Sequence, residues 1–108
     1  MTRAGAVAAL LLLASCGIAV PADRRDYVGI WRGPNMTLEI QPGGHVEYER
    51  RRGAATTSVS APLQSFVGDD FVVGAIGITT TFHVQRRPYL DGMIWKIMVD
   101  SVELTRDP

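Results

Sequence analysis

Apolar and polar residues alternate along most of the chain after its first quarter, and a period of two is typical of half-buried β-strands. Residues 36–41 place Met36, Leu38 and Ile40 on one face, and residues 45–50 alternate in the same way after a Pro-Gly-Gly break. Two alternating runs around a glycine-rich break predict a hairpin. Helical spacing is hard to find in this part of the chain, so we expect an all-β domain.

The same alternation continues to the C-terminus and is interrupted by short turn signals. Pro62 closes a run rich in Thr and Ser that we interpret as an edge strand, and Pro88 marks a loop. Residues 74–77 are interpreted as a flexible link, and residues 100–101 as a two-residue turn. The expected strands are residues 27–32, 36–41, 45–50, 54–61, 71–73, 78–85, 93–99 and 102–105. About seven or eight short antiparallel strands predict a small up-and-down barrel, a half-barrel or a compact sandwich.

The beginning of the chain has a different pattern. Arg3 is followed by an uncharged run over residues 4–13. This run is too short to span a membrane, which needs about 20 apolar residues, but it has the length of the apolar region of a secretory signal peptide. The small residues Ala14 and Ser15 follow, and then Cys16, the only cysteine. The alternative is an ordinary signal peptide with an incidental cysteine.

Leu13-Ala14-Ser15-Cys16 resembles the lipobox of bacterial lipoproteins. The resemblance implies cleavage before Cys16, a diacylglyceryl group on its thiol, and usually three acyl chains such as palmitate, which hold the protein at a membrane. Gly17 stands where the inner-membrane retention signal of the family is Asp, so the resemblance implies the periplasmic face of the outer membrane. The expected organisation is a signal peptide over residues 1–15, an acylated cysteine and flexible tether over residues 16–25, and a single β-barrel-like domain over residues 26–108.

Charge and cysteine content exclude several classes of protein. The chain has 11 basic residues, and losing Arg3 with the signal peptide leaves 10 against 11 acidic ones, a net charge of −1. So small a charge gives no electrostatic footprint for nucleic acid, and we expect no nucleic-acid partner. Acylation of Cys16 leaves no free thiol, which excludes disulfide bonds and thiol catalysis.

Gly29-Ile30-Trp31 resembles the Gly-x-Trp motif that opens lipocalin-like barrels. The resemblance implies that Trp31 plugs the closed end of the barrel, that residues 23–28 form a short helical turn, and that Arg106 packs on the Trp. This chain is about half as long as a typical lipocalin. Short strands make a barrel only about 15 Å tall, so its interior is either fully packed or holds a small apolar pocket. The side chains expected there, as core or ligand contacts, are Trp31, Tyr48, Phe82 and Trp95.

Candidate catalytic and metal-binding residues are sparse. His45 and His83 are the only histidines, and both are expected on polar faces. A structural zinc site needs four close ligands of Cys or His type, so we expect no metal and no cofactor. No Gly-x-Ser-x-Gly motif is present. We therefore expect that the protein is not an enzyme.

Arg50, Arg51 and Arg52 form the densest group of charges in the chain. Guanidinium groups suit phosphate, so this run is a candidate contact for anionic lipid headgroups. The alternative is a hairpin end that its charges keep soluble.

Together these features predict a non-enzymatic, membrane-anchored periplasmic lipoprotein that binds a protein partner or a small apolar ligand. The alternative function is a periplasmic inhibitor or envelope-assembly accessory that inserts a loop into its partner. Lysozyme-inhibitor lipoproteins are small β-barrels too, although they usually carry a disulfide. A third hypothesis, an anchored hydrolase, requires His45 or His83 within hydrogen-bond reach of Ser or Asp.

Overall fold

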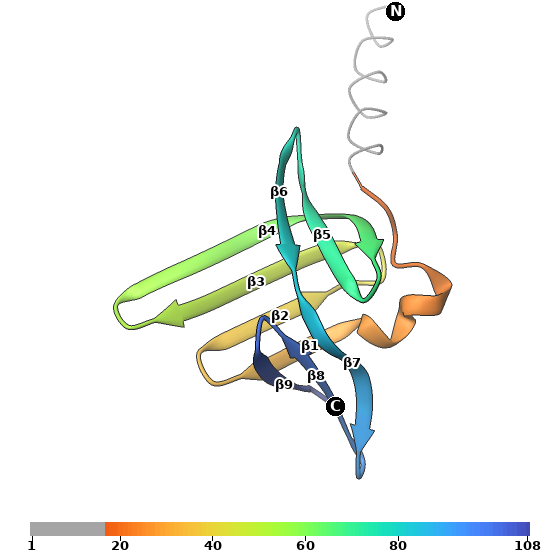
Figure 1. Cartoon of the computed structure of the whole chain (residues 1–108), viewed down its shortest axis with the longest axis vertical. Helices are drawn as coiled ribbons and strands as arrows, with labels where there is room; N and C mark the ends of the chain where they lie inside the picture. The colour runs from red at the N-terminus through yellow and green to blue at the C-terminus, as the bar shows by residue number, and fades with distance from the viewer. Residues whose placement is uncertain (1–16) are drawn as a thin grey trace, which may run out of the picture.

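Tight turns connect almost all the strands of this protein. The computed structural model describes residues 17–108, so the expected signal peptide and Cys16 lie outside the described residues. Six of the connections between strands are two residues long, and each contains a residue with positive φ, as hairpin turns require. The elements are the 3-10 helix η1 (Ala22–Tyr27) and the strands β1 (Gly29–Gly33), β2 (Met36–Ile40), β3 (His45–Arg52), β4 (Ala55–Val67), β5 (Asp70–Ala75), β6 (Ile78–Phe82), β7 (Val84–Asp91), β8 (Ile94–Val99) and β9 (Val102–Arg106) (Figure 1).

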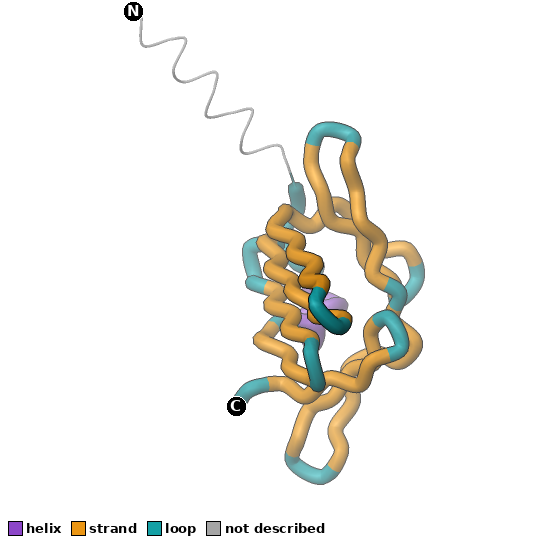
Figure 2. Tube along the Cα trace, turned by 90° about the vertical axis from the view of Figure 1, so that its left-hand side faces the viewer, coloured by secondary structure: helices purple, strands orange, loops and turns teal. Residues whose placement is uncertain are grey.

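The strands form one antiparallel sheet in the order β6-β5-β4-β3-β2-β1-β9-β8-β7. The two edge strands, β6 and β7, are consecutive in the chain, and only His83 lies between them. The sheet is therefore curled, and its two edges come together at this residue to give a half-barrel (Figure 2). The all-β prediction is confirmed. The strand count of seven or eight is wrong, because the described chain has nine strands.

One predicted strand, residues 78–85, is split in two at His83. The backbone N–H of His83 donates to Asp100 Oδ1 (3.0 Å), and its carbonyl accepts the Asp100 N–H (2.7 Å). The next N–H, that of Val84, donates to Asp70 Oδ1 (2.8 Å). These bonds come from Asp100 in the β8–β9 turn and from Asp70 at the start of β5, so the chain leaves β5 at this point and pairs with β8 instead.

Pro62 does not end a strand, and β4 is not an edge strand as predicted. Strand β4 runs through Pro62 and lies between β3 and β5. Pro62 is opposite His45, in the last pair of the β3–β4 ladder, and a register shift between Leu63 and Ser65 follows. A proline is tolerated here because the strand changes its pairing partner, so the missing N–H interrupts no ladder.

Two segments expected as irregular are largely strand. Pro88 lies within β7, where it is accommodated by the register shift between Arg86 and Tyr89 on an edge strand. The expected flexible link over residues 74–77 is the end of β5 followed by a two-residue turn. The predicted turn at residues 100–101 is confirmed, and both of its residues have positive φ.

The core fills the inside of the curled sheet. Aromatic rings meet edge to face or stacked, with 5.0 Å between the centroids of Phe71 and Phe82 and 4.9 Å between those of Tyr48 and Phe82. All fifteen buried side chains of the described chain are hydrophobic: Tyr27, Trp31, Met36, Leu38, Ile40, Val46, Tyr48, Leu63, Phe71, Val73, Phe82, Val84, Ile97, Val99 and Leu104. Strands contribute alternate residues to this core, as the period of two predicts.

The N-terminal segment packs on the domain as soon as the described chain begins. Ile18 N–H donates to Leu63 O (2.9 Å), and Val20 N–H donates to Pro42 O (3.0 Å). Helix η1 follows and places Tyr27 in the core, which agrees with the helical turn expected over residues 23–28. The segment interpreted as a flexible tether is thus held in place from residue 17 on. Among the described residues, no helix is long and apolar enough to cross a membrane.

Candidate functional site

Three of the four aromatic residues predicted as core or ligand contacts are core. Trp31 is 0 % exposed, Phe82 1 % and Tyr48 8 %. A side chain with no accessible surface has no water-sized space beside it, so no apolar ligand reaches Trp31 or Phe82 in this structure. Trp95 differs, because it is half-buried and packs on the outside of the core.

Trp95 shares a cation with Trp31. The Arg106 guanidinium lies 5.6 Å from the ring centroid of Trp31 and 5.0 Å from that of Trp95, and it donates to Val28 O at 3.4 Å. The sequence resemblance expected Arg106 on Trp31, and the structure brings the two together. The indole Nε1–H of Trp31 donates to Tyr27 O (2.9 Å), so the buried ring has its polar atom satisfied.

Next to Trp95, the tip of the β7–β8 hairpin exposes large apolar side chains. Met93 is 96 % exposed, Leu90 55 % and Ile94 49 %. A hollow of about 380 Å³ adjoins them, lined by residues 93–95 of the tip and residues 105–108 of the C-terminal segment. We call Leu90, Met93, Ile94 and Trp95 the β7–β8 patch. Large apolar side chains exposed together at one tip are typical of an interaction site.

Polar residues border the β7–β8 patch on one side. Lys96 Nζ lies 2.9 Å from Asp91 Oδ2, and this ion pair raises the pKa of Lys96. The Tyr89 hydroxyl donates to Glu103 Oε2 (2.9 Å), which raises the pKa of the tyrosine, and the Arg86 guanidinium stacks 3.5 Å from the Tyr89 ring centroid. The result is an apolar centre with a charged rim, which is the usual organisation of a protein interface.

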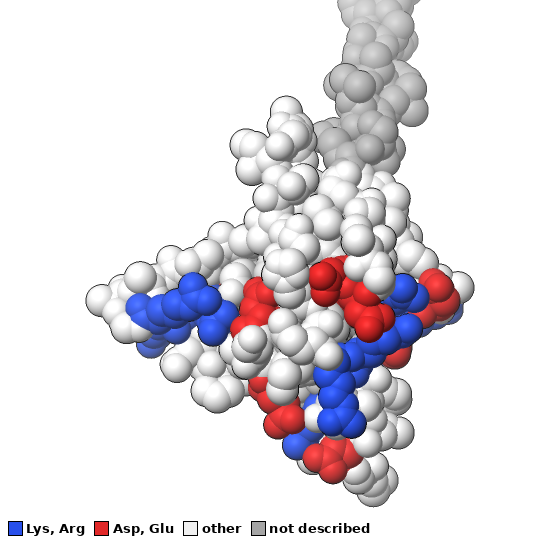
Figure 3. Space-filling view, viewed as in Figure 1, with Lys and Arg blue, Asp and Glu red and all other residues white. Residues whose placement is uncertain are grey.

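The three arginines predicted as an anionic contact lie at the end of β3, next to the tip of the β3–β4 hairpin. Figure 3 shows basic side chains gathered at the extremity of the molecule where this hairpin ends. Within residues 17–108 no ion pair involves Arg50, Arg51 or Arg52, and Arg51 and Arg52 are exposed. Their position fits both predicted interpretations, a phosphate contact and a soluble hairpin end.

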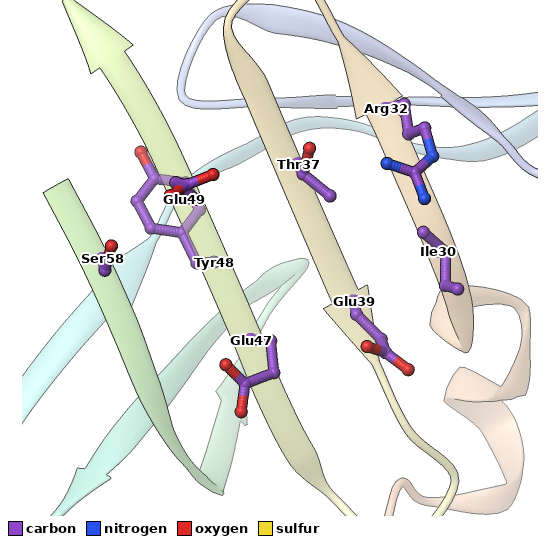
Figure 4. Close-up of a pocket in the computed structure, with 8 residues that line it drawn as sticks. All are labelled: Ile30, Arg32, Thr37, Glu39, Glu47, Tyr48, Glu49 and Ser58. Atoms are coloured by element: carbon purple, nitrogen blue, oxygen red, sulfur yellow. The ribbon is translucent and has the colours of Figure 1, made fainter. Parts of the chain in front are cut away.

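An open hollow of about 420 Å³ lies across strands β1 to β4 (Figure 4). It is lined by Ile30, Arg32, Thr37, Glu39, Glu47, Tyr48, Glu49 and Ser58. Glu39 and Glu47 are register partners on β2 and β3, so two carboxylates lie side by side. Arg32 does not neutralise them, because its Nε donates to Asp107 Oδ2 (2.9 Å). Nowhere in residues 17–108 are three His, Asp or Glu side chains grouped to hold a metal ion.

His45 lies beside a serine and a glutamate, but the three do not form a nucleophilic triad. The Ser60 hydroxyl donates to Glu47 Oε2 (2.7 Å), and Glu47 also contacts His45 Nε2. These bonds lower the pKa of Glu47. Ser60 Oγ is 3.4 Å from the same His45 nitrogen. In a triad the base accepts from the serine on one nitrogen and donates to the carboxylate from the other.

His83 lies at the junction of the two edge strands. Its Nδ1 is 3.1 Å from Asp70 Oδ2, and the other carboxylate oxygen of Asp70 accepts the Val84 N–H. The two hydrogen bonds hold the pKa of Asp70 below its usual value. This arrangement joins β5 to the start of β7.

Comparisons of the chain with models of protein families, with curated proteins and with solved structures found no match. The geometry of the described residues therefore carries the functional argument.

The exposed residues of the β7–β8 patch were not among the predicted site residues. Met93 shares its alternation with Trp95, Ile97 and Val99, so the pattern assigns it to the inner face of the strand. In the structure, however, Met93 lies in the two-residue turn between β7 and β8, outside the strand, and this turn extends beyond the core. The Asp-Gly turn signal directly before Met93 was the only local indication that this residue lies at the tip of a hairpin.

Proposed function

We propose that this protein is a non-enzymatic lipoprotein, anchored through Cys16 at the periplasmic face of the bacterial outer membrane, which binds a protein partner through the β7–β8 patch. The observation that carries the proposal is the exposure of Met93, Leu90 and Ile94 beside the half-buried Trp95. Methionine, aromatic residues and arginine are all enriched in protein interfaces. The patch contains Met93 and Trp95, and Arg106 contacts the Trp95 ring.

A protein partner is favoured over a small apolar ligand for two reasons. The aromatic side chains of the interior are buried, with exposed fractions of 8 % or less for Trp31, Tyr48 and Phe82, and the hollow of about 380 Å³ beside Trp95 is open to solvent. Small-molecule sites enclose most of the surface of their ligand. A hairpin that extends from the body presents a convex apolar tip, which is complementary to a groove in another protein.

The position of the patch supports an anchored role. The described chain begins at one end of the molecule, and the β7–β8 tip lies at the opposite end (Figures 1 and 2). A lipid anchor at Cys16 then leaves the patch pointing away from the membrane, where a periplasmic protein reaches it.

A photoreactive amino acid at position 93 tests the proposal in cells, with the exposed Thr57 of β4 as the control position. We expect a discrete crosslinked product at position 93 and none at position 57. The product should be lost when the chain with the photoreactive residue at position 93 also carries Leu90→Ser/Ile94→Ser, a double variant that is expected to fold normally because both side chains are exposed. Equal crosslinking at both positions, or a product that persists in the double variant, contradicts the proposal. The mass of the mature N-terminus tests the anchor, and an unmodified Cys16 refutes it.

The second candidate function is an inhibitor that inserts this hairpin into the cleft of a periplasmic enzyme. The convex, apolar β7–β8 tip favours it. The activity of the crosslinked partner distinguishes the two roles. An inhibited enzyme recovers activity when the wild-type chain is replaced by Met93→Ser/Ile94→Ser, whereas a partner that is only bound shows no such change.

A further inference from the structure

We propose that the tip of the β5–β6 hairpin is a second membrane contact, where Ile76 and Ile78 insert into the surface of the bilayer that holds Cys16. The inference rests on the proposed lipid anchor and adds an orientation to it. The domain would stand with this hairpin on the bilayer and the β7–β8 patch directed away.

The first support is an exposed and uncharged surface. Ile76 is 96 % exposed and Ile78 79 %, although isoleucine is normally among the most buried residues. Residues 71–82, which include all of the β5–β6 hairpin except its first residue Asp70, contain no Asp, Glu, Lys or Arg. In the space-filling view, charged side chains gather across the middle and lower parts of the molecule and leave this end free of charge (Figure 3). A surface with apolar tips and threonine hydroxyls next to them matches the boundary between acyl chains and headgroups.

The second support is the backbone conformation of Ile76. Its φ is +56°, and the other described non-glycine residues with positive φ are Asn35, Asp100 and Ser101. A β-branched residue is an outlier in this region of conformational space. The turn formed with Gly77 prefers Asn, Asp or Gly at this position. Neither folding nor solubility favours an exposed isoleucine here, so its presence points to a contact outside the chain.

The third support is the distance from the anchor. Ile18 is hydrogen-bonded to Leu63 of β4, and two residues of chain span at most about 7 Å. The acylated Cys16 therefore cannot move far from the body of the domain. Figures 1 and 2 both place the β5–β6 tip at the same end as the start of the described chain. Such a short link gives the tip a high effective concentration at the bilayer.

The test uses the mature acylated protein in vesicles of phosphatidylethanolamine and phosphatidylglycerol that contain a nitroxide-labelled lipid. Because acylation consumes the thiol of Cys16, a single introduced cysteine carries a bimane dye without competition. Thr79→Cys reports on the β5–β6 tip, and Met93→Cys on the opposite tip. We expect lipid quenching of the dye to be about threefold stronger at position 79, since insertion of 5–10 Å brings it to the nitroxide.

The variant Ile76→Asn separates the contact from folding. It gives the Asn-Gly pair that this turn prefers, so we expect a higher urea midpoint. In the same variant, quenching at position 79 should fall to the level at position 93. Opposite effects on stability and on quenching cannot come from misfolding.

Three results would overturn the inference. Equal quenching at positions 79 and 93, on a protein that floats with the vesicles, refutes the contact and leaves the lipid anchor intact. A dye at position 79 that is shielded from water but not quenched by lipid shows that a protein, such as a second copy of this chain, covers the tip. A protein that takes up two dyes per chain has an unmodified Cys16, and then the anchor and the contact both fail.

Discussion

The guanidinium of Arg106 lies 5.6 Å from the ring centroid of Trp31, and Gly29 provides the space for it. A Cβ atom at position 29 would be 2.6 Å from Cδ of Arg106 and 3.0 Å from its Cγ, and the φ of Gly29 is +145°. Strands β1 and β9 carry these residues and pair with each other, so the contact joins the first and last strands of the chain in the middle of the sheet. This gives a physical reason for the glycine and the tryptophan of the Gly-x-Trp motif.

Removing the charge of Arg106 should weaken the contact between β1 and β9. Arg106→Met keeps most of the side-chain stem but loses the cation–π contacts with Trp31 and Trp95. We expect the free energy of unfolding to fall by about 1–2 kcal/mol, measured by urea unfolding. Arg52→Met is the control, because Arg52 is exposed and makes no ion pair within residues 17–108; equal losses in both variants would contradict the role of Arg106.

Tyr27 should make stability depend on pH in the alkaline range. Its hydroxyl donates to Asp69 O (2.8 Å), and burial, followed by the charge of Asp69, raises its pKa from 10.0 to about 12. Because the folded pKa lies above the unfolded one, the contribution of Tyr27 is complete below pH 10 and is lost between pH 10 and about 12.

Tyr27→Phe tests this linkage. The variant should lose about 1 kcal/mol at pH 7, the value of one hydrogen bond. Its free energy of unfolding should also fall less than that of the wild type when the pH is raised above 10. Urea unfolding at pH 7 and above pH 10 measures both effects. Tyr89→Phe is the comparison, since the hydroxyl of Tyr89 is on the surface. A steep alkaline decline that is the same in Tyr27→Phe and wild type would refute the assignment.

Asp70 should make stability depend on pH in the acidic range. Its carboxylate accepts from Val84 N–H and contacts His83, and these hydrogen bonds lower its pKa from the usual 3.8. A lowered folded pKa means that its contribution is complete above the ordinary value and is lost as the pH falls through the folded value. Asp70→Ala should cost about 1–3 kcal/mol at pH 7.

The difference between Asp70→Ala and the wild type should shrink as the pH is lowered to about 2, because protonated Asp70 no longer supports the junction at His83. Urea midpoints across this range provide the measurement. Asp91→Ala is the matched control, because the Asp91 side chain is 60 % exposed and a surface ion pair contributes about 0–1 kcal/mol. A difference that stays constant with pH would argue against the role of the Asp70 carboxylate.

Gly44 should be required for docking of the N-terminal segment. A Cβ atom at position 44 would be 1.9 Å from the carbonyl oxygen of Ile18, and its φ is +100°. Gly44→Ala is expected to cost about 2–3 kcal/mol through strain and displacement of this segment. Hydrogen exchange at the amides of Ile18 and Val20 should accelerate.

The neighbouring residue gives the control for this prediction. A Cβ atom at Gly43 meets nothing within 4 Å. Gly43→Ala should therefore change neither the urea midpoint nor the exchange of the two amides. If both alanine variants behave alike, residues 17–20 are not held by the close approach at Gly44.

What the sequence determined by itself is local. Alternation in residues 36–41 and 45–50 predicted β2, β3 and the hairpin between them, because a strand places successive side chains on opposite faces. The all-β class and the turn at residues 100–101 follow from the same local chemistry. The alternation also placed Tyr48 and Phe82 on inward faces, whereas the inward position of Trp31 was expected from the Gly-x-Trp resemblance.

Only the tertiary structure decided how these strands are paired and covered. The split at His83 depends on Asp70 and Asp100, which are distant in sequence, and so no local pattern contains it. Pro62 does not end a strand, because β4 changes its pairing partner from β3 to β5 at this residue. Alternation tells which side chains share a face, but not whether another strand covers that face. The sequence places Met93 in an expected strand and Ile76 in an expected link. Only the fold shows that both lie in two-residue turns, exposed at opposite tips of the molecule.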